Sequence, residues 1–469
     1  MGFACQRLPL SQEEGIFLFN MYQRLTTQDM VRAYCQKPEI VDNLLYVDAI
    51  DSFYVFDLDK GYFKKLRDID LERKIYLYLA SNTGKNLSTA LVRDFILQMK
   101  YRVYRTVENL NFNYITLSDK KVLNVKNFEI ETISLDKPPF HCINCLSNDI
   151  KNFNGNPPER FGQYLNEVIV DDGLQPDKEM QLVVQEMIGY YLLNTLEAHV
   201  AFFLIGKGRN GKSVMLDVIR EIVGEDFCEA MPVEMMTSDK FATSNLVGKK
   251  LNICAEDEST FVKTDKFKAM IGGDPISVER KYGARFMWKP TVKHIFATNE
   301  MPSFSGFNKA LTERLKIIPF NRFFAKEERD TKLFQKLKGE LGGIIAWAIE
   351  GAKRLKENRF MFSDSAMVDK KGYEFQGNIS AAVLFFNENY EKQTNGFVSN
   401  DDMYENYKLW CDRRGKKKQS YYVFIRDIDT LTDLPNIEGN GDEGLIVFGK
   451  EIERKKQKTQ EEVLNSLEF

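Results

Sequence analysis

One stretch decides the fold of this chain: Val200-Ala-Phe-Phe-Leu-Ile-Gly-Lys-Gly-Arg-Asn-Gly-Lys-Ser-Val-Met-Leu-Asp-Val-Ile219. Its first apolar residues predict a buried strand that ends at Ile205, and the apolar positions after Ser213 predict a helix with one apolar face. The glycine-spaced segment between them fits the pattern G-x-x-x-x-G-K-[ST]. We therefore interpret the stretch as a strand, a phosphate-binding loop and a helix.

The chemistry of phosphate binding explains the spacing in this loop. Glycines let the backbone curl until its N–H groups point inward at an anion, and the N-terminus of the following helix adds its positive end. Lys212 can reach the terminal phosphates of ATP, and the Ser213 hydroxyl can ligate Mg²⁺. The alternative is a chance match in an ordinary glycine loop, but the flanking strand and helix disfavour it. The residues assigned to the nucleotide are Gly206, Lys207, Gly208, Arg209, Asn210, Gly211, Lys212, Ser213 and Val214.

Polar side chains follow two later apolar stretches. Residues 251–258 predict a second buried strand with Glu256 and Asp257 at its end, where a nucleotide site needs an acid to hold Mg²⁺ and to polarise the attacking water. Residues 292–299 predict a third strand, and Asn299 at its end could orient that water. The expected catalytic residues are Lys212, Glu256, Asp257, Asn299 and Arg314, and the expected metal ligands are Ser213 and Glu256.

The order of these features resembles a known family. Residues from about 140 to 420 resemble the superfamily 3 helicases of the phage and plasmid primase–helicase type and, within that group, the replication initiators of phage-inducible chromosomal islands. The resemblance implies a ring-forming AAA+ ATPase that uses ATP and Mg²⁺ and unwinds DNA in the 3′-to-5′ direction. The segments that carry it are residues 206–213, Glu256, residues 268–276, Arg280, residues 297–302 and residues 314–320.

Two positions depart from the family pattern. An aromatic–Arg pair usually precedes the Arg that matches Arg314, and Thr312-Glu313 stands there in this chain. An Asp is usual where Asn308 lies. These departures affect the surroundings of the site and leave the class of protein unchanged.

Composition bounds the possible functions. The 469 residues suffice for about three domains, and a hydrophobic fraction of 43% is typical of globular proteins. Lys+Arg 65 against Asp+Glu 68 leave no basic excess, so contacts to DNA must come from local patches. The sequence has no apolar run near the roughly 20 residues that span a bilayer, and no signal-peptide core at its start. Seven scattered cysteines fit reduced thiols, so we expect a protein of the bacterial cytosol that does not enter membranes.

The N-terminal third is predicted to be mainly helical, with a β-hairpin over residues 51–63. Asp57 and Asp59 form a D-x-D that could belong to a primase metal site. The sequence Asp59-Lys60-Gly61 is a turn signal, so we favour the turn.

Two further segments precede the phosphate-binding loop. His141, Cys142 and Cys145 invite a zinc interpretation, but a structural zinc site needs four ligands and only three candidates cluster here. Residues 153–195 have a helical pattern that resembles the family's helical collar, which would help to build a ring.

A candidate grip on single-stranded DNA lies between the acidic strand and the Asn299 strand. Residues 272–288 predict a hairpin, because apolar residues alternate on each side of a turn at Gly283. Its tip would carry Arg280, Lys281 and Tyr282, and cations bind phosphates while an aromatic ring can stack on a base. The alternative is a solvated tip, although the matching hairpin of the resembling family tracks DNA in the ring channel. We expect Lys281 to make the principal contact. Lys268 contacts a neighbouring subunit's nucleotide or is an ordinary surface lysine.

The last hundred residues predict a DNA-binding module. Residues 342–351 before it predict a helix, interpreted as a lid beside the nucleotide with Trp347 in the core, and residues 365–378 suit a linker. Three predicted helices, the third beginning near Tyr421, and a following strand pair resemble a winged helix, with a basic turn where duplex phosphates would be contacted. The alternative is a solvated basic loop. The expected contacts are Lys416, Lys417, Lys418, Tyr421, Tyr422 and Arg426.

The expected fold is an α/β P-loop AAA+ core with a mainly helical N-terminal region and a winged-helix-like C-terminal domain. The predicted function is an ATP-dependent hexameric DNA helicase and replication initiator that recognises an origin. Two alternatives stay open: an origin-binding protein in which ATP only drives assembly, and a DNA-packaging motor or AAA+ remodeller. The expected domains are residues 1–140 (N-terminal), 141–195 (collar), 196–365 (ATPase) and 366–469 (C-terminal).

Overall fold

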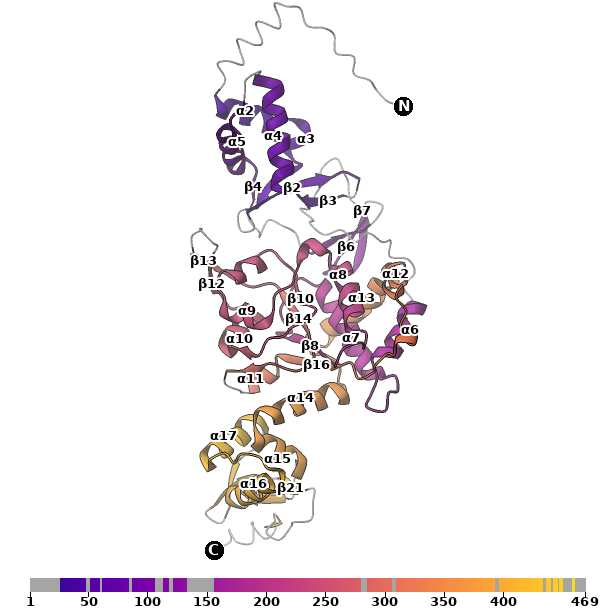
Figure 1. Ribbon diagram of the computed structural model, residues 1–469, viewed down its shortest axis with the longest axis vertical. Helices are drawn as coiled ribbons and strands as arrows, with labels where there is room; N and C mark the ends of the chain where they lie inside the picture. The colour runs from indigo at the N-terminus through magenta and orange to yellow at the C-terminus, as the bar shows by residue number, and fades with distance from the viewer. Residues whose placement is uncertain are drawn as a thin grey trace, which may run out of the picture. The chain divides into compact units, whose positions relative to one another are not determined.

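The computed structural model divides the chain into two compact units, Met1–Ile150 and Lys151–Phe469 (Figure 1). Among the residues that the structure describes, no helix combines the length and the apolar character needed to cross a bilayer. The described residues are 26–47, 51–59, 61–83, 87–105, 113–117, 121–132, 156–279, 285–305, 309–392, 396–432, 436–439, 442–445, 447–449 and 458–459.

The first unit packs helices against a four-stranded sheet of order β3-β2-β1-β4. Its core includes Phe53 of the sheet and Tyr34, Ile75 and Phe95 from three different helices. A separate three-stranded meander, β5-β6-β7, follows. The elements are α2 (Thr27–Cys35), α3 (Pro38–Val41), β1 (Leu44–Val47), β2 (Ser52–Asp57), β3 (Tyr62–Lys65), α4 (Asp68–Thr83), α5 (Thr89–Arg102), β4 (Tyr104–Arg105), β5 (Tyr114–Thr116), β6 (Lys121–Asn124) and β7 (Glu129–Thr132).

The predicted hairpin of the first unit is confirmed. Strands β2 and β3 pair antiparallel, with Asp57 opposite Tyr62. The Asp59 backbone N–H donates to Asp57 Oδ1 at 3.1 Å, which is the hydrogen bond of a turn in which an Asp side chain accepts from the backbone two residues on. Asp57 therefore serves the turn, as the turn signal predicted. The zinc candidates His141, Cys142 and Cys145 lie outside the described residues.

The second unit is built on a parallel five-stranded sheet of order β16-β8-β14-β10-β9. The predicted strands are confirmed, and the strand before the phosphate-binding loop ends at Ile205 as expected. The elements up to the end of the sheet are α6 (Glu159–Val168), α7 (Lys178–Leu192), β8 (Ala201–Ile205), α8 (Lys212–Val223), β9 (Cys228–Glu229), α9 (Val233–Ser238), β10 (Leu251–Cys254), β11 (Phe261–Val262), α10 (Thr264–Gly272), β12 (Ile276–Glu279), β13 (Arg285–Trp288), β14 (Lys293–Thr298), β15 (Ser303–Phe304), α11 (Lys309–Thr312) and β16 (Leu315–Pro319).

Helices cover both faces of this sheet (Figure 1). On one face Phe203 and Phe296 pack with Met236 of α9 and Phe267 of α10. On the other face Phe202 packs edge-on against Tyr191 of α7, and α13 (Leu341–Glu357) packs along α7. Parallel strands buried on both sides need apolar residues at nearly every position, which explains their continuous apolar runs.

Two predictions for the region after the sheet are wrong. Residues 365–378 are not a linker, because α14 (Ala366–Ile379) packs against β16 and buries Phe375 against Phe304. Helix α13 is not a lid, because it packs on α7 and, among the described residues, none of its side chains lines the cavity at the carboxyl edge of the sheet. Trp347 lies in the core as predicted, edge-on to Phe161.

The C-terminal part of the second unit has a core of its own. Phe385, Tyr407, Trp410 and Phe424 join three helices around it. The described strands there pair antiparallel, β17 with β21, and β18 with both β20 and β22. The elements are α15 (Ala381–Asn389), β17 (Tyr390–Lys392), β18 (Gly396–Ser399), α16 (Asn400–Arg414), α17 (Tyr421–Thr432), β19 (Asn436–Gly439), β20 (Asp442–Leu445), β21 (Val447–Gly449) and β22 (Lys458–Thr459).

Candidate nucleotide site

A cavity of about 680 Å³ opens at the carboxyl ends of β8, β14 and β10. Ligands of open parallel sheets bind at this edge, where the strand-to-helix loops converge. The residues that line the cavity are Arg160, Tyr164, Glu167, Val168, Gly208, Arg209, Asn210, Gly211, Lys212, Ser213, Val214, Ala255, Glu256, Asp257, Glu258, Ala297, Thr298, Asn299, Phe324, Glu328, Arg329, Asp330, Thr331, Leu333 and Phe334.

The glycines of the loop are required by conformation and by close packing. Gly211 begins α8 with a φ of 93°, in the left-handed region, and a Cβ there would lie 2.7 Å from Val168 Cγ1. A Cβ on Gly206 would lie 2.6 Å from the Phe320 carbonyl oxygen. The loop therefore packs closely against α6 on one side and against the segment after β16 on the other, and both contacts restrict its conformation.

Hydrogen bonds hold the loop from the same two sides. The Tyr164 hydroxyl donates to the Gly211 carbonyl at 2.9 Å, and burial raises the pKa of this phenol, so it stays a donor. Asn210 Nδ2 donates to the Phe320 carbonyl at 3.2 Å, and the Phe324 N–H donates to the Arg209 carbonyl at 2.9 Å. These contacts leave a preformed loop at the N-terminus of α8, where an anion is favoured.

Lys212 points back into its own loop. Its Nζ donates to the Gly206 carbonyl and to Asn210 Oδ1, the latter at 3.3 Å. The side chain is buried, and burial lowers the pKa of its ammonium group, because desolvation disfavours the charged form. A phosphate chain in the loop would supply the anionic partner that this ammonium group lacks.

The two acids after β10 differ in their surroundings. Asp257 is 4% exposed, and its oxygens accept from the Val233 N–H and the Ser259 N–H, each at 2.9 Å. Glu256 is exposed to the cavity, and its carboxylate has no hydrogen-bond partner in the described part of the chain. Asp257 therefore holds the loop after β10 in shape, and Glu256 is the carboxylate available for a metal ion or a water molecule.

The expected site residues fall into three groups. Lys212, Ser213, Val214, Glu256, Asp257 and Asn299 line one cavity with Gly208, Arg209, Asn210 and Gly211. Gly206 and Lys207 belong to the loop but do not line the cavity. Arg314 lies elsewhere: its carbonyl accepts from the Ala201 N–H at the amino end of β8.

Arg314 and Lys268 have partners of their own. Arg314 Nη1 donates to the Ala310 carbonyl at 2.6 Å, while its buried Nε has no hydrogen-bond partner among the described residues. Lys268 Nζ lies 3.5 Å from Asp265 Oδ1 and is largely covered.

One wall of the cavity was missed by the sequence prediction. It consists of Arg160, Tyr164, Glu167 and Val168 on α6 and of the segment 324–334 after β16. The spacing of the α6 residues places them on one face of a helix. That pattern alone does not identify the partners of this face, because they are Gly211, 47 positions after Tyr164, and the still more distant segment 324–334.

Comparisons with known proteins point to viral helicase-like proteins. The model of a family of unknown function (DUF5906) matches residues 204–314, from the end of β8 to Arg314. The chain is similar to "Putative helicase L207/L206" of Acanthamoeba polyphaga mimivirus, at 29% identity over 171 residues, which is 35% of this chain and 18% of that protein. It is also similar to "Putative helicase 121R" of Invertebrate iridescent virus 3, at 22% identity over 270 residues, which is 50% of this chain and 29% of that protein.

The chain covers less than a third of the length of either viral relative. Among solved structures, the A-form apo structure of the NrS-1 C-terminal region aligns with 86% of this chain and 96% of that chain, at 13% identity. The TM-score of 0.41 marks a loose likeness.

The expected DNA contacts lie in two places. Strands β12 and β13 form the predicted hairpin, with Ile276 opposite Trp288. Glu279 Oε2 forms an ion pair with Lys240 Nζ at 2.7 Å. The tip residues Arg280, Lys281 and Tyr282 lie outside the described residues.

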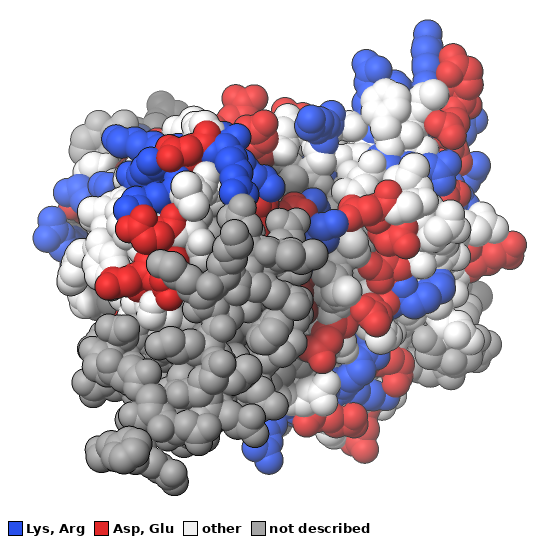
Figure 2. All heavy atoms as spheres, turned by 90° about the horizontal axis from the view of Figure 1, so that it is seen from below, with Lys and Arg blue, Asp and Glu red and all other residues white. Residues whose placement is uncertain are grey.

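The basic turn of the C-terminal part leads directly into α17, whose Tyr422 is 77% exposed. Lys416 and Lys417 are exposed, whereas Lys418 pairs with Asp412 and Arg426 pairs with Asp427, at 2.7 and 2.8 Å. Acidic side chains also lie among the basic ones on the face that Figure 2 shows. The basic surface of this part is therefore local.

Proposed function

We propose that this chain is an ATP-dependent DNA helicase of the superfamily 3 type. The observation that carries the proposal is that the ends of three neighbouring strands bring Lys212 and Ser213, Glu256, and Asn299 into one cavity. The similarity to two viral proteins named putative helicases supports the choice of a helicase as the enzyme class.

The residues present fit ATP and Mg²⁺. The N–H groups of the loop and the Lys212 ammonium group would hold the terminal phosphates, and the exposed Ser213 hydroxyl and Glu256 carboxylate offer the oxygen ligands that Mg²⁺ prefers. Bound Mg²⁺ supplies charge neutralisation at the phosphates. Glu256 would accept a proton from the attacking water, and the Asn299 amide would orient that water.

The finer proposals concern assembly and DNA. The proposed assembly is a homo-hexamer, a ring closed by rotational symmetry. In such a ring Arg314 of one subunit would lie at the nucleotide of the next subunit. Lys281, Arg280 and Tyr282 at the hairpin tip would hold single-stranded DNA in the channel and draw it in the 3′-to-5′ direction. The order helix, two strands, two helices and paired strands in residues 381–449 is compatible with a winged helix that selects an origin.

ATPase and strand-separation assays test this proposal. Lys212→Ala should abolish hydrolysis and unwinding, because the terminal phosphates lose their cation. Lys281→Ala should keep basal ATPase activity and lose both unwinding and stimulation by single-stranded DNA. Unchanged ATP turnover in Lys212→Ala would refute the nucleotide site. ATPase activity that no DNA stimulates in the wild type would favour a protein in which ATP only drives assembly.

A further inference from the structure

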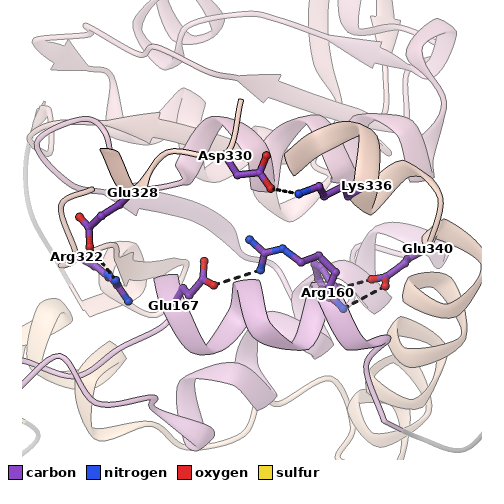
Figure 3. A network of polar contacts seen from close by, with 8 residues as sticks. Arg160, Glu167, Arg322, Glu328, Asp330, Lys336 and Glu340 are labelled. Carbon is purple, nitrogen blue, oxygen red and sulfur yellow. Dashed lines mark hydrogen bonds and ion pairs between the residues drawn. The ribbon is translucent and has the colours of Figure 1, made fainter. Parts of the chain in front are cut away.

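The wall of the cavity that α6 and residues 324–334 form beside the phosphate-binding loop contains several ion pairs (Figure 3). Arg160 Nη1 donates to Glu167 Oε1 at 3.2 Å, Arg322 Nη2 to Glu328 Oε1 at 3.4 Å, and Lys336 Nζ to Asp330 Oδ2 at 2.6 Å. Each carboxylate that faces the cavity from this wall is thus paired with a cation. Arg329 also lines the cavity from this wall, and its Nε donates to the Phe324 carbonyl at 3.2 Å, so the wall combines these ion pairs with one further cation.

Three of the four carboxylates in this network have both oxygens engaged. Glu328 Oε2 accepts from the Ala325 N–H at 2.8 Å, and Asp330 Oδ1 accepts from the Lys332 N–H at 3.0 Å. Glu340 accepts from the N–H groups of Arg160 and Phe161 at the start of α6, at 3.1 and 2.9 Å. These acids hold the wall in place, and each of their oxygens already accepts one hydrogen bond from the protein.

Glu167 differs from the other three. Only its Oε1 is engaged, by Arg160, and within the described residues its Oε2 has no hydrogen-bond partner. The neighbouring Val168 lies against Gly211, so this turn of α6 borders the phosphate-binding loop. Val168, Leu333 and Phe334 add apolar surface to the same cavity, against which a flat base can pack.

We infer that α6 and residues 324–334 form the nucleoside half of the site, and that Glu167 Oε2 determines its specificity by accepting a hydrogen bond from the nucleoside. The donor is a ribose hydroxyl or the amino group of adenine, since an ionised carboxylate only accepts. Arg160 is a positioning residue that holds the other oxygen. The inference rests on the proposed nucleotide site and deepens it.

Binding measurements on the full chain test this assignment, with Mg²⁺ present. In Glu167→Gln the amide oxygen faces Arg160, so an NH₂ group replaces the free acceptor and opposes the nucleoside donor. ATP should bind about tenfold to a hundredfold more weakly, the usual effect of losing a hydrogen bond to a charged group. Inorganic tripolyphosphate, which has no nucleoside, should bind the variant and the wild type equally. Glu159→Gln, on the exposed side of the same helix, is the matched control and should behave as the wild type.

Analogues identify the donor and separate the outcomes. If the donor is a ribose hydroxyl, 2′-deoxy-ATP or 3′-deoxy-ATP should bind the wild type as weakly as ATP binds Glu167→Gln; if it is the amino group, inosine triphosphate should. ATP binding to Glu167→Gln within twofold of the wild type would overturn the assignment, and so would an equal loss of ATP and tripolyphosphate. A wild type that binds neither ligand would overturn the proposed function as well.

Discussion

At the scale of the residue, the two neighbouring acids after β10 show how burial separates roles that the sequence leaves together. The Asp257 oxygens accept from two backbone N–H groups and the side chain is buried, whereas Glu256 faces the cavity. A buried carboxylate that satisfies backbone donors is needed for the fold, because removing it leaves those donors unpaired. Only Glu256 is free to touch a ligand.

The two acids should therefore respond differently to amide substitution. Glu256→Gln should bind ATP and lose turnover by about 10² to 10⁴, the usual contribution of a positioned general base. Asp257→Asn should be milder in turnover per folded molecule, but less stable by about 1 to 3 kcal/mol, since its NH₂ group would oppose a backbone N–H. ATP turnover and thermal unfolding of both variants check this. A folded but inactive Asp257→Asn beside an active Glu256→Gln would exchange the roles.

His294 carries a second prediction at this scale. It is buried in β14, neither ring nitrogen is hydrogen-bonded within the part of the chain that the structure describes, and burial lowers its pKa from 6.5 to about 3. As the pH falls below 6.5, the His294 imidazole of the unfolded chain binds a proton, whereas that of the folded chain stays neutral. The free energy of unfolding therefore decreases toward acid pH. This residue should contribute about 2 kcal/mol of that loss between pH 7 and pH 5.

Replacing His294 by Leu should remove this contribution. The shift of the unfolding midpoint between pH 7 and pH 5 should become smaller than in the wild type, with ATPase activity retained. His199→Asn is the matched control, because His199 is exposed and Asn tolerates its positive φ. Equal acid sensitivity in His294→Leu and the wild type would show that His294 does not titrate in this way.

At the scale of the element, α14 connects the sheet to the C-terminal part and belongs to the sheet's core. Phe375 is 6% exposed and meets Phe304 edge-on, and Lys370 Nζ lies 2.5 Å from Asp172 Oδ2. Helix α14 buries only one face, so many of its other residues are polar. Because of this polar composition, the sequence predicts a linker here. The boundary for separating functions therefore lies after this helix.

Two truncations should have different consequences. A chain that ends at Ile379 should keep ATPase activity and lose selective binding to duplex DNA, because the proposed winged helix is absent. A chain that ends at Ser365 should be destabilised as well, by about 3 to 5 kcal/mol from the loss of Phe375 alone. Phe375→Ala in the full chain is the control that measures the contribution of Phe375 to the free energy of unfolding. Selective DNA binding by the chain ending at Ile379 would place recognition elsewhere.

At the scale of the whole molecule, the position of Arg314 bears on assembly. Its carbonyl pairs with the amino end of β8, while Lys212 follows the carboxyl end of the same strand. A strand of five residues separates these ends by about 13 Å at roughly 3.3 Å per residue. Arg314 is therefore far from the Lys212 of its own subunit.

Mixing two inactive variants should reveal such a partner. Arg314→Ala should keep ATP binding and lose about 10³ to 10⁵ in hydrolysis, the range known for arginine fingers. Lys212→Ala subunits can still donate their Arg314, so mixed rings should recover part of the ATPase activity. Confirmed mixed rings without any recovery would contradict a finger that acts between subunits. Near-normal turnover of Arg314→Ala alone would make it an ordinary structural residue.

Local patterns in the sequence were sufficient for the strands, the phosphate-binding loop and the polar residues that follow β10 and β14. Periodicity, glycine spacing and capping chemistry act between near neighbours, so these features can be read from a few residues. The parallel pairing of the strands then follows from alternating strands and helices.

The tertiary structure alone decided which side chains remain free. Glu340 caps α6 from 180 positions away, Asp257 is engaged by backbone N–H groups, and Glu167 keeps one unpaired oxygen. The helical identity of α14 depends in the same way on a core that distant segments build. Hydrogen-bond satisfaction and burial are set by contacts between distant parts of the chain, and no local pattern encodes them.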